Sequence, residues 1–282
     1  MSKKPHYLIA CVLSLLIGTQ AFASEPAAST ENKNVIRLAI VNTPAYSGFI
    51  QYLLEDFEKN TDFSVKIYNG ADVYNKARAG KADIVISHYG KKQLKQFVLD
   101  GLGSWPKMVF SNQAVLIGSK DDPANIRNLS DAATAFSQIA KSKALFINNA
   151  IPNITYLTDI LWDLTGQPIK QDWFLETGQV MAQVALRAEK EKAYFIWGAY
   201  PFLRYKQQFD SQLEILVSDD PLLQRMMSST LVNPEKIPNV NHEGAVQLQS
   251  YLLEPATQAK IATFRAPETG NHQLWWPAGR HN

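Results

Sequence analysis

Apolar runs of strand length alternate with helical apolar stripes along this chain. Residues 35–41 (VIRLAIV) are apolar almost throughout, as expected of a parallel strand buried on both faces. Phe49, Leu53 and Phe57 then recur every four residues, which predicts a helix that runs to about Asn60. The alternation continues as a strand, a short helix ended by glycine, and a third strand, at residues 64–68, 72–79 and 82–87. This order predicts an α/β fold with right-handed crossovers.

A second set of helices and strands follows a longer apolar stretch at residues 105–119. Its helices are expected to begin at polar or glycine positions, namely Ser130, Asn153 or Thr155, and Gly178. Its strands are expected at residues 144–147, 193–197 and 214–218. This second βα set predicts a second lobe.

The end of the chain is expected to return to the first lobe. A strand at residues 229–232 leads back, and helices at residues 243–253 and 255–264 follow, the second with proline at its first position. Two α/β lobes are therefore expected, joined by two crossing strands, with a cleft between them that closes on a small ligand. Lobe one is predicted to comprise residues 35–115 and 226–282, and lobe two residues 116–225.

The first residues of the chain have the pattern of a secretory signal peptide. Lys3 and Lys4 precede a short apolar run at residues 7–18, and Ala21-Phe22-Ala23 fits the rule for cleavage sites. We therefore expect residues 1–23 to be a signal peptide and residues 24–34 a disordered leader. Cleavage removes the one cysteine and two lysines, so the mature chain is thiol-free and its net charge falls from +2 to zero. This predicts a soluble periplasmic protein.

Composition excludes several classes of function. The chain has 282 residues, of which 46% are hydrophobic and 19% charged, so it is neither disordered nor fibrous. His88, His242 and His272 lack the spacing of metal ligands, and no metal site is predicted. The sequence has no stripe of basic residues, so nucleic acid is not expected as a partner. No nucleophile elbow, P-loop or Rossmann glycine pattern is present, so catalytic residues and a cofactor have no support.

Several segments of the mature chain carry a resemblance to a known family. The chain resembles the tungstate-binding proteins of bacterial ABC importers, which are phosphate-binding-like periplasmic proteins. The matching segments are residues 47–67, 79–88, 117–126, 173–181, 232–248 and 254–264. The resemblance implies the two-lobed periplasmic-binding-protein fold of type II, an oxyanion such as tungstate or molybdate as the ligand, and an ABC permease as the membrane partner. A monomer is expected.

The ligand-binding turns of this family are only partly matched. Family members have a hydroxyl-rich turn after the first strand, another after the second, and a Ser-Arg-Gly loop at the start of a second-lobe helix. Here Asn42 and Thr43 follow the first strand, and the second turn, with Gly70, has no hydroxyl. Asn149 stands where the family has its arginine, and Thr155 is expected to retain a hydroxyl at the helix start. The pocket therefore replaces charge-matching donors with neutral ones.

The candidate ligand-binding residues follow from these turns. They are Asn42, Thr43 and Gly70 in lobe one, and Asn148, Asn149 and Thr155 in lobe two. For the asparagines, turn and cap chemistry is the alternative role, because asparagine favours both. For Trp197 and Tyr200, packing in the core or at the hinge is favoured over stacking on a ligand.

Two functions from different classes remain open at this point. The first is a periplasmic solute-binding protein that closes its lobes on a small ligand and delivers it to a permease. The alternative is a sensory or interaction protein that kept the fold but lost or changed the transport ligand. The two-lobe plan and the family resemblance motivate the first hypothesis, and the altered set of donors motivates the second.

Overall fold

The computed structural model describes residues 34–278. The predicted signal peptide and all but the last residue of the predicted leader lie outside the described residues. Within residues 34–278, no helix is both long enough and apolar enough to cross a membrane.

The main sheet joins strands from both ends of the chain in the order β10-β4-β9-β3-β1-β2. Strands β1, β2 and β3 are parallel to one another, whereas β9 is antiparallel to β3 and β4 is antiparallel to β9. The bounds are β1 Val35–Ile40, β2 Ser64–Asn69, β3 Ile84–His88, β4 Lys107–Ser119, β9 Gln224–Leu231 and β10 Trp276–Pro277. The crossover connections predicted from the alternation of strands and helices are therefore present.

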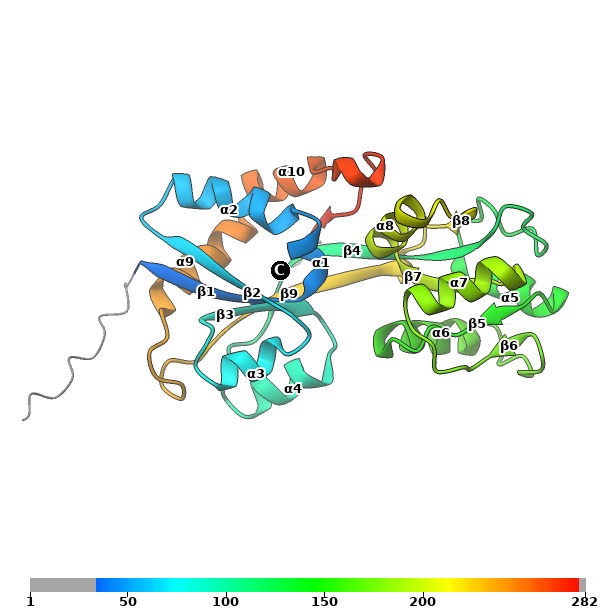
Figure 1. Ribbon diagram of the computed structural model, residues 1–282. Coiled ribbons are helices and arrows are strands. Elements are labelled where there is room, and N and C mark those ends of the chain that lie inside the picture. The colour runs from blue at the N-terminus through cyan, green and yellow to red at the C-terminus, as the bar shows by residue number, and fades with distance from the viewer. Residues whose placement is uncertain (1–33, 279–282) are drawn as a thin grey trace, which may run out of the picture. The chain divides into compact units, whose positions relative to one another are not determined.

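Helices cover both faces of this first-lobe sheet (Figure 1). Helices α2 (Phe49–Lys59), α9 (His242–Leu253) and α10 (Pro255–Thr263) lie on one side. Helices α3 (Val73–Arg78) and α4 (Lys92–Leu99) lie on the other side. The predicted apolar stripe of α2 is buried, and its first residue, Phe49, stacks on Trp275 with ring centroids 4.3 Å apart.

Strand β4 continues past its pairing with β9 into a second group of elements. Its residues up to Gln113 pair with β9, and those from Ala114 onward pair with β7 (Phe195–Gly198) and β8 (Leu213–Val217). The other elements of this group are α5 Ala132–Ser142, β5 Phe146–Ile147, α6 Pro152–Leu164, β6 Phe174–Leu175, α7 Ala182–Glu191 and α8 Ala199–Phe209. A separate apolar core, with Phe136 packed edge-on against Phe146, supports this second lobe.

The fold is thus the predicted α/β fold, with β4 and β9 as the crossing strands. We propose the same lobe boundaries as before, with residues 116–225 as the second lobe. The change in the pairing of β4 after Gln113 supports a boundary close to residue 115.

Several predicted helix starts are wrong by a few residues. Helix α5 is capped by Asp131, whose side chain accepts from the Thr134 N–H, and not by Ser130. Helix α6 begins at Pro152, upstream of Asn153 and Thr155, because a proline has no N–H to leave unpaired in the first turn.

Helix α7 begins later than predicted, at Ala182 rather than Gly178. Gly178 and Met181 both have a positive φ, 71° and 53°, so the intervening residues form a turn and not a helix. Strand β9 begins at Gln224, five residues before the predicted start at residue 229.

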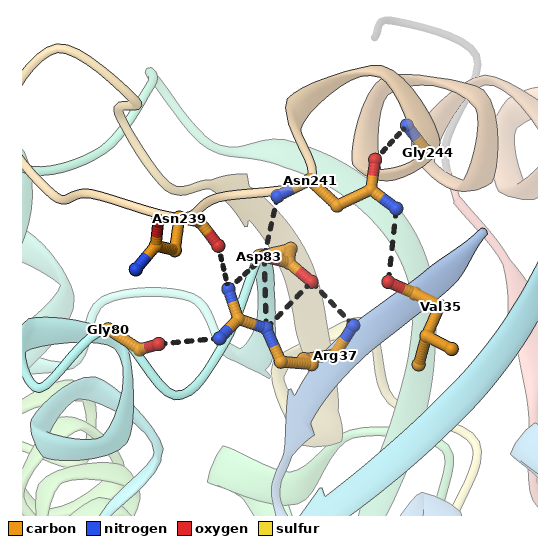
Figure 2. A network of polar contacts seen from close by, with 7 residues as sticks. All are labelled: Val35, Arg37, Gly80, Asp83, Asn239, Asn241 and Gly244. Atoms are coloured by element: carbon orange, nitrogen blue, oxygen red, sulfur yellow. Dashed lines mark hydrogen bonds and ion pairs between the residues drawn. The ribbon is translucent and has the colours of Figure 1, made fainter. Parts of the chain in front are cut away.

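A buried ion pair fixes the return of the chain to the first lobe (Figure 2). The Arg37 guanidinium donates to both carboxylate oxygens of Asp83, with Nη2 at 2.6 Å from Oδ1. Asp83 also accepts from the backbone N–H of Arg37 at 2.6 Å and of Asn241 at 2.9 Å. The remaining guanidinium donors reach the carbonyl oxygens of Gly80 and Asn239. The network joins β1 and β3 to the segment that leads into α9.

Candidate functional site

The carboxyl ends of β1, β2 and β3 meet at one edge of the first-lobe sheet. The Val41 N–H donates to the Ile86 carbonyl at 3.2 Å, and the Asn69 amide donates to Asn42 Oδ1 at 3.1 Å. Asn42 and Thr43 are the first residues of the short helix α1 (Asn42–Tyr46), which has no side-chain cap. Ligands of open α/β sheets bind at this edge. The first two predicted site residues therefore lie at the carboxyl edge of the sheet, and their contact with a ligand stays a prediction.

Gly70 lies at the same edge but has a structural function as well. Its N–H donates to the Ile40 carbonyl at 3.1 Å, which closes the turn after β2. Its φ of 154° is one that L side chains rarely adopt, so the turn favours glycine. Asp72 is paired with Lys76 at 2.5 Å, and this hydrogen bond lowers the pKa of Asp72. The turn can therefore offer its backbone groups to a ligand, but it has no side-chain hydroxyl group to offer.

Asn149, predicted to contact the ligand, is fully buried and bonded on both sides to backbone. Its Nδ2 donates to the Ile196 carbonyl at 3.2 Å, and its Oδ1 accepts from the Met181 N–H at 3.1 Å. These bonds connect the turn after β5 to β7 and to the residue that precedes α7. This geometry favours the turn role of Asn149 over direct ligand contact.

Asn148 has the opposite character. Its side chain is buried, with 6% of its surface exposed, yet its Oδ1 has no hydrogen-bond partner among residues 34–278. The Oδ1 of Asn153, the second residue of α6, is also buried without a partner in that range. An unpaired buried amide group costs about 1–3 kcal/mol, and rotation of the amide presents either its oxygen or its NH₂. Asn148 is therefore the predicted lobe-two residue best suited to bind a solute.

Thr155 is not at the open start of its helix. Because α6 begins at Pro152, the Thr155 N–H already bonds the Ile151 carbonyl, at 2.9 Å. Its hydroxyl donates to the Asn149 carbonyl at 3.3 Å. The structure thus brings the predicted residues together as two groups, each at the strand ends of its own lobe.

A cluster of basic residues, which the sequence analysis missed, lies at the carboxyl end of β3. It comprises His88, Lys91 and Arg225, all half-buried, together with Asn112 on β4. The His88 ring Nε2 lies 3.3 Å from Asn112 Oδ1. Burial lowers the pKa of His88 well below its ordinary value, and the charges of Arg225 and Lys91 add to this effect. Burial also lowers the pKa of Arg225 to about 10.

The sequence offered weak signals for this cluster. Three lysines at positions 91, 92 and 95 are typical of a solvated helix face, but only Lys92 and Lys95 are exposed, whereas Lys91 is half-buried. Arg225 lay outside the predicted strand. The signal would have been a longer strand. If the strand is extended back to residue 224 and paired with β3, Arg225 comes close to His88.

Tyr200 is confirmed as a packed residue. It is 7% exposed, and its hydroxyl donates to the Tyr46 carbonyl at 2.6 Å, which links α8 to α1. Trp197, 6% exposed, packs edge-on against Tyr205. Over residues 34–278 no three His, Cys, Asp or Glu side chains are grouped as a metal site would require.

The chain has the two-lobed α/β fold of the type II periplasmic binding proteins. No family model matches the chain. The chain is 28% identical over 246 residues to the tungstate-binding protein TupA of Peptoclostridium acidaminophilum, covering 86% of this chain and 85% of that protein. It is 27% identical over 249 residues to a protein of Haloferax volcanii that is named a putative ABC transporter anion-binding protein. The match covers 86% of this chain and 71% of that protein.

Solved structures agree with these relatives. The tungstate ABC transporter structure from Geobacter sulfurreducens matches with a TM-score of 0.69 and 28% identity, covering 82% of this chain and 99% of that one. TupA from Desulfovibrio alaskensis has the same fold, with a TM-score of 0.77 at 24% identity, covering 87% and 99%. The predicted resemblance to the tungstate-binding proteins of ABC importers is confirmed, and with it a solute-binding function. Nothing in these relatives favours the sensory alternative.

Proposed function

We propose that this chain is the periplasmic solute-binding protein of an ABC-type importer and that it binds a small oxyanion, tungstate or molybdate, between its lobes. The observation that carries the proposal is the buried side chain of Asn148 at the strand-end turn of the second lobe, whose Oδ1 has no hydrogen-bond partner among residues 34–278. The names of two relatives, tungstate-binding and anion-binding, support the class of ligand. A membrane permease is the partner that such a protein requires.

The chemistry of the turns suits a tetrahedral anion. The oxygens of an oxyanion accept hydrogen bonds from amides, hydroxyls and helix N-termini. Lobe one offers Asn42, the Thr43 hydroxyl and the backbone around Gly70, and lobe two offers Asn148. Asn149 and Thr155 act as positioning residues in this proposal, because their side chains bond to the surrounding turn.

Ligand capture is proposed to occur by hinge closure. Strands β4 and β9 are the two connections between the lobes, so bending at these strands brings the two groups of turns together. Closure around the anion removes water from the donors and strengthens their electrostatic attraction to the ligand.

A thermal-shift panel on the purified exported chain tests the proposal. The ligands are tungstate, molybdate, phosphate, sulfate and a set of neutral metabolites. A ligand at about 1,000 times its dissociation constant adds about 4 kcal/mol of stability. For a chain of this size the expected rise in Tm is about 8–16 °C. No response to any oxyanion would overturn the proposal.

Variants locate the ligand. Asn148→Ala is expected to weaken tungstate binding about 10- to 100-fold, because one hydrogen bond to a charged group contributes about 1.5–3 kcal/mol. Asn75→Ala, at an exposed position of α3, is the matched control and is expected to bind as the wild type does. Equal affinities of these two variants would argue against the assignment of Asn148.

A further inference from the structure

We propose that Arg225 and Lys91, with the uncharged His88 ring beside them, form a cationic subsite that binds the charge of an anionic ligand at the carboxyl edge of the first-lobe sheet. The inference rests on the proposed function and deepens it. The predicted turn residues of both lobes carry no charge, so any cationic charge for the proposed pocket has to come from another part of the chain. The cluster supplies this charge from the crossing strand β9 and from the end of β3.

The strand register places three members of the cluster on one face of the sheet. His88 pairs with Met227, and Arg225, two residues earlier on β9, pairs with Asn112 on β4. Directly paired residues and residues two apart on a strand share a face. His88, Arg225 and Asn112 therefore lie on the same face, and the 3.3 Å contact between His88 and Asn112 spans β9.

Lys91 is positioned by the segment that follows β3. The Tyr89 N–H donates to the Met226 carbonyl at 2.9 Å, so the segment remains attached to β9 beyond the end of β3. Lys91 is half-buried, and burial together with the charge of Arg225 lowers its pKa. The charges of Arg225 and Lys91 are thus close enough to repel each other.

No carboxylate neutralises this cluster among residues 34–278. Arg225 forms no ion pair or hydrogen bond there, and the groups that act on His88 are Arg225, Lys91 and the Asn112 amide. Arg37, on β1 of the same sheet, shows the ordinary structural solution, because its guanidinium is neutralised by Asp83 (Figure 2). A half-buried arginine beside two other basic groups is costly unless an anion completes the arrangement.

The cluster is at the same edge as the proposed lobe-one donors. β3 lies beside β1 in the sheet, and the Val41 N–H, just before Asn42, bonds the Ile86 carbonyl. His88 is two residues beyond Ile86. All members of the cluster are accessible to solvent in part, so a small anion can reach them. Guanidinium and ammonium groups bind the oxygens of tetrahedral oxyanions more strongly than neutral amides do.

Isothermal titration calorimetry with sodium tungstate tests the inference. The wild type is compared with Arg225→Gln, Arg225→Lys and Lys91→Gln. Arg225→Gln and Lys91→Gln are each expected to weaken binding about 10- to 100-fold, the worth of a charge-assisted hydrogen bond, while Arg225→Lys retains part of the affinity. Arg187→Gln, which removes an exposed charge paired with Glu191, is the control and is expected to bind normally.

The outcomes separate the inference from the proposed function. If the wild type binds tungstate and Arg225→Gln binds equally well, the subsite is overturned and the proposed function stands. If the wild type binds neither tungstate nor molybdate, both are overturned. The Tm of the ligand-free protein gives a second readout. Removal of an unneutralised charge is expected to leave this Tm unchanged or to raise it, whereas a decrease of several degrees in Arg225→Gln would indicate a structural role.

Discussion

Replacement of Asp83 by asparagine is expected to be among the most damaging single changes in the first lobe. The Asp83 side chain is fully buried and that of Arg37 is 12% exposed, so the pair is almost entirely removed from water. Asparagine has nearly the same shape, but it has no charge and only one acceptor oxygen. Arg37 would therefore remain as a buried guanidinium without its counter-charge.

The expected loss follows from these contacts. Removal of one partner of a buried ion pair costs about 3–5 kcal/mol. In a protein of this size, 1 kcal/mol lowers Tm by about 2–4 °C, so Asp83→Asn is expected to lower Tm by about 6–20 °C. The loss belongs to the first lobe, because Asp83 joins β1, β3 and the segment before α9.

Urea unfolding followed by circular dichroism measures this effect. Asp121→Asn is the matched control, because Asp121 also pairs with a basic residue, Lys192, but the two side chains are 64% and 67% exposed. Salt screens such a pair, and little change in stability is expected. If Asp83→Asn lost less than about 1 kcal/mol, or no more than Asp121→Asn, the network would not stabilise the lobe as argued.

Three further outcomes are expected. Tyr200→Phe removes the 2.6 Å bond to the Tyr46 carbonyl, so backbone amides in and directly after α1 should exchange faster with deuterium, and unchanged exchange would contradict this. Asn149→Ala leaves the Ile196 carbonyl and one N–H unpaired, which should cost about 2–4 kcal/mol of unfolding free energy in urea titrations; retention of stability would refute a structural role. The pKa of folded His88 lies below its unfolded value of about 6.5, so the unfolded state binds the extra proton and stability falls as pH drops below about 6.5. His88→Asn should flatten this loss in Tm between about pH 7.5 and 5, and an unaltered profile would assign the proton to another group.

Strongly periodic segments were predictable from the sequence alone. The predicted first helix and the observed α2 begin at the same residue, and the C-terminal helices α9 and α10 agree within one residue at each end. In these segments local pattern and tertiary packing favour the same structure, as with Phe49, Leu53 and Phe57 on the buried face of α2.

Segments that depend on distant partners were not predictable. The first residues of β9, QRMM, contain no apolar alternation, and they form a strand because β3 and β4 pair with the strand on either side. Helix α8 was missed because Gly198 and Pro201 resemble a break. Pro201 is the third residue of the helix, where its missing N–H disrupts no intrahelical bond.

The candidate site shows the same division. The strand-end turns at Asn42 and Asn148 followed from strand order, because the carboxyl ends of parallel strands meet at one edge. The role of Asn149 could not be predicted from strand order, because the Ile196 carbonyl to which it donates lies 47 residues away in the chain. The Arg225 cluster required the register of β9 against two other strands, which no local pattern in the sequence specifies.

The pairing of Gln113 with Gln224 has a consequence for how this architecture can change over evolution. These register partners are the last residue of β4 and the first of β9 that pair with each other, so the chain leaves the first sheet and returns to it at adjacent points. In topological terms the whole second lobe is an insertion in a hairpin loop. A gene segment encoding it can be exchanged for another whose ends lie equally close, without altering the strand order of the host sheet. The two halves of the binding surface are therefore heritable as separate modules.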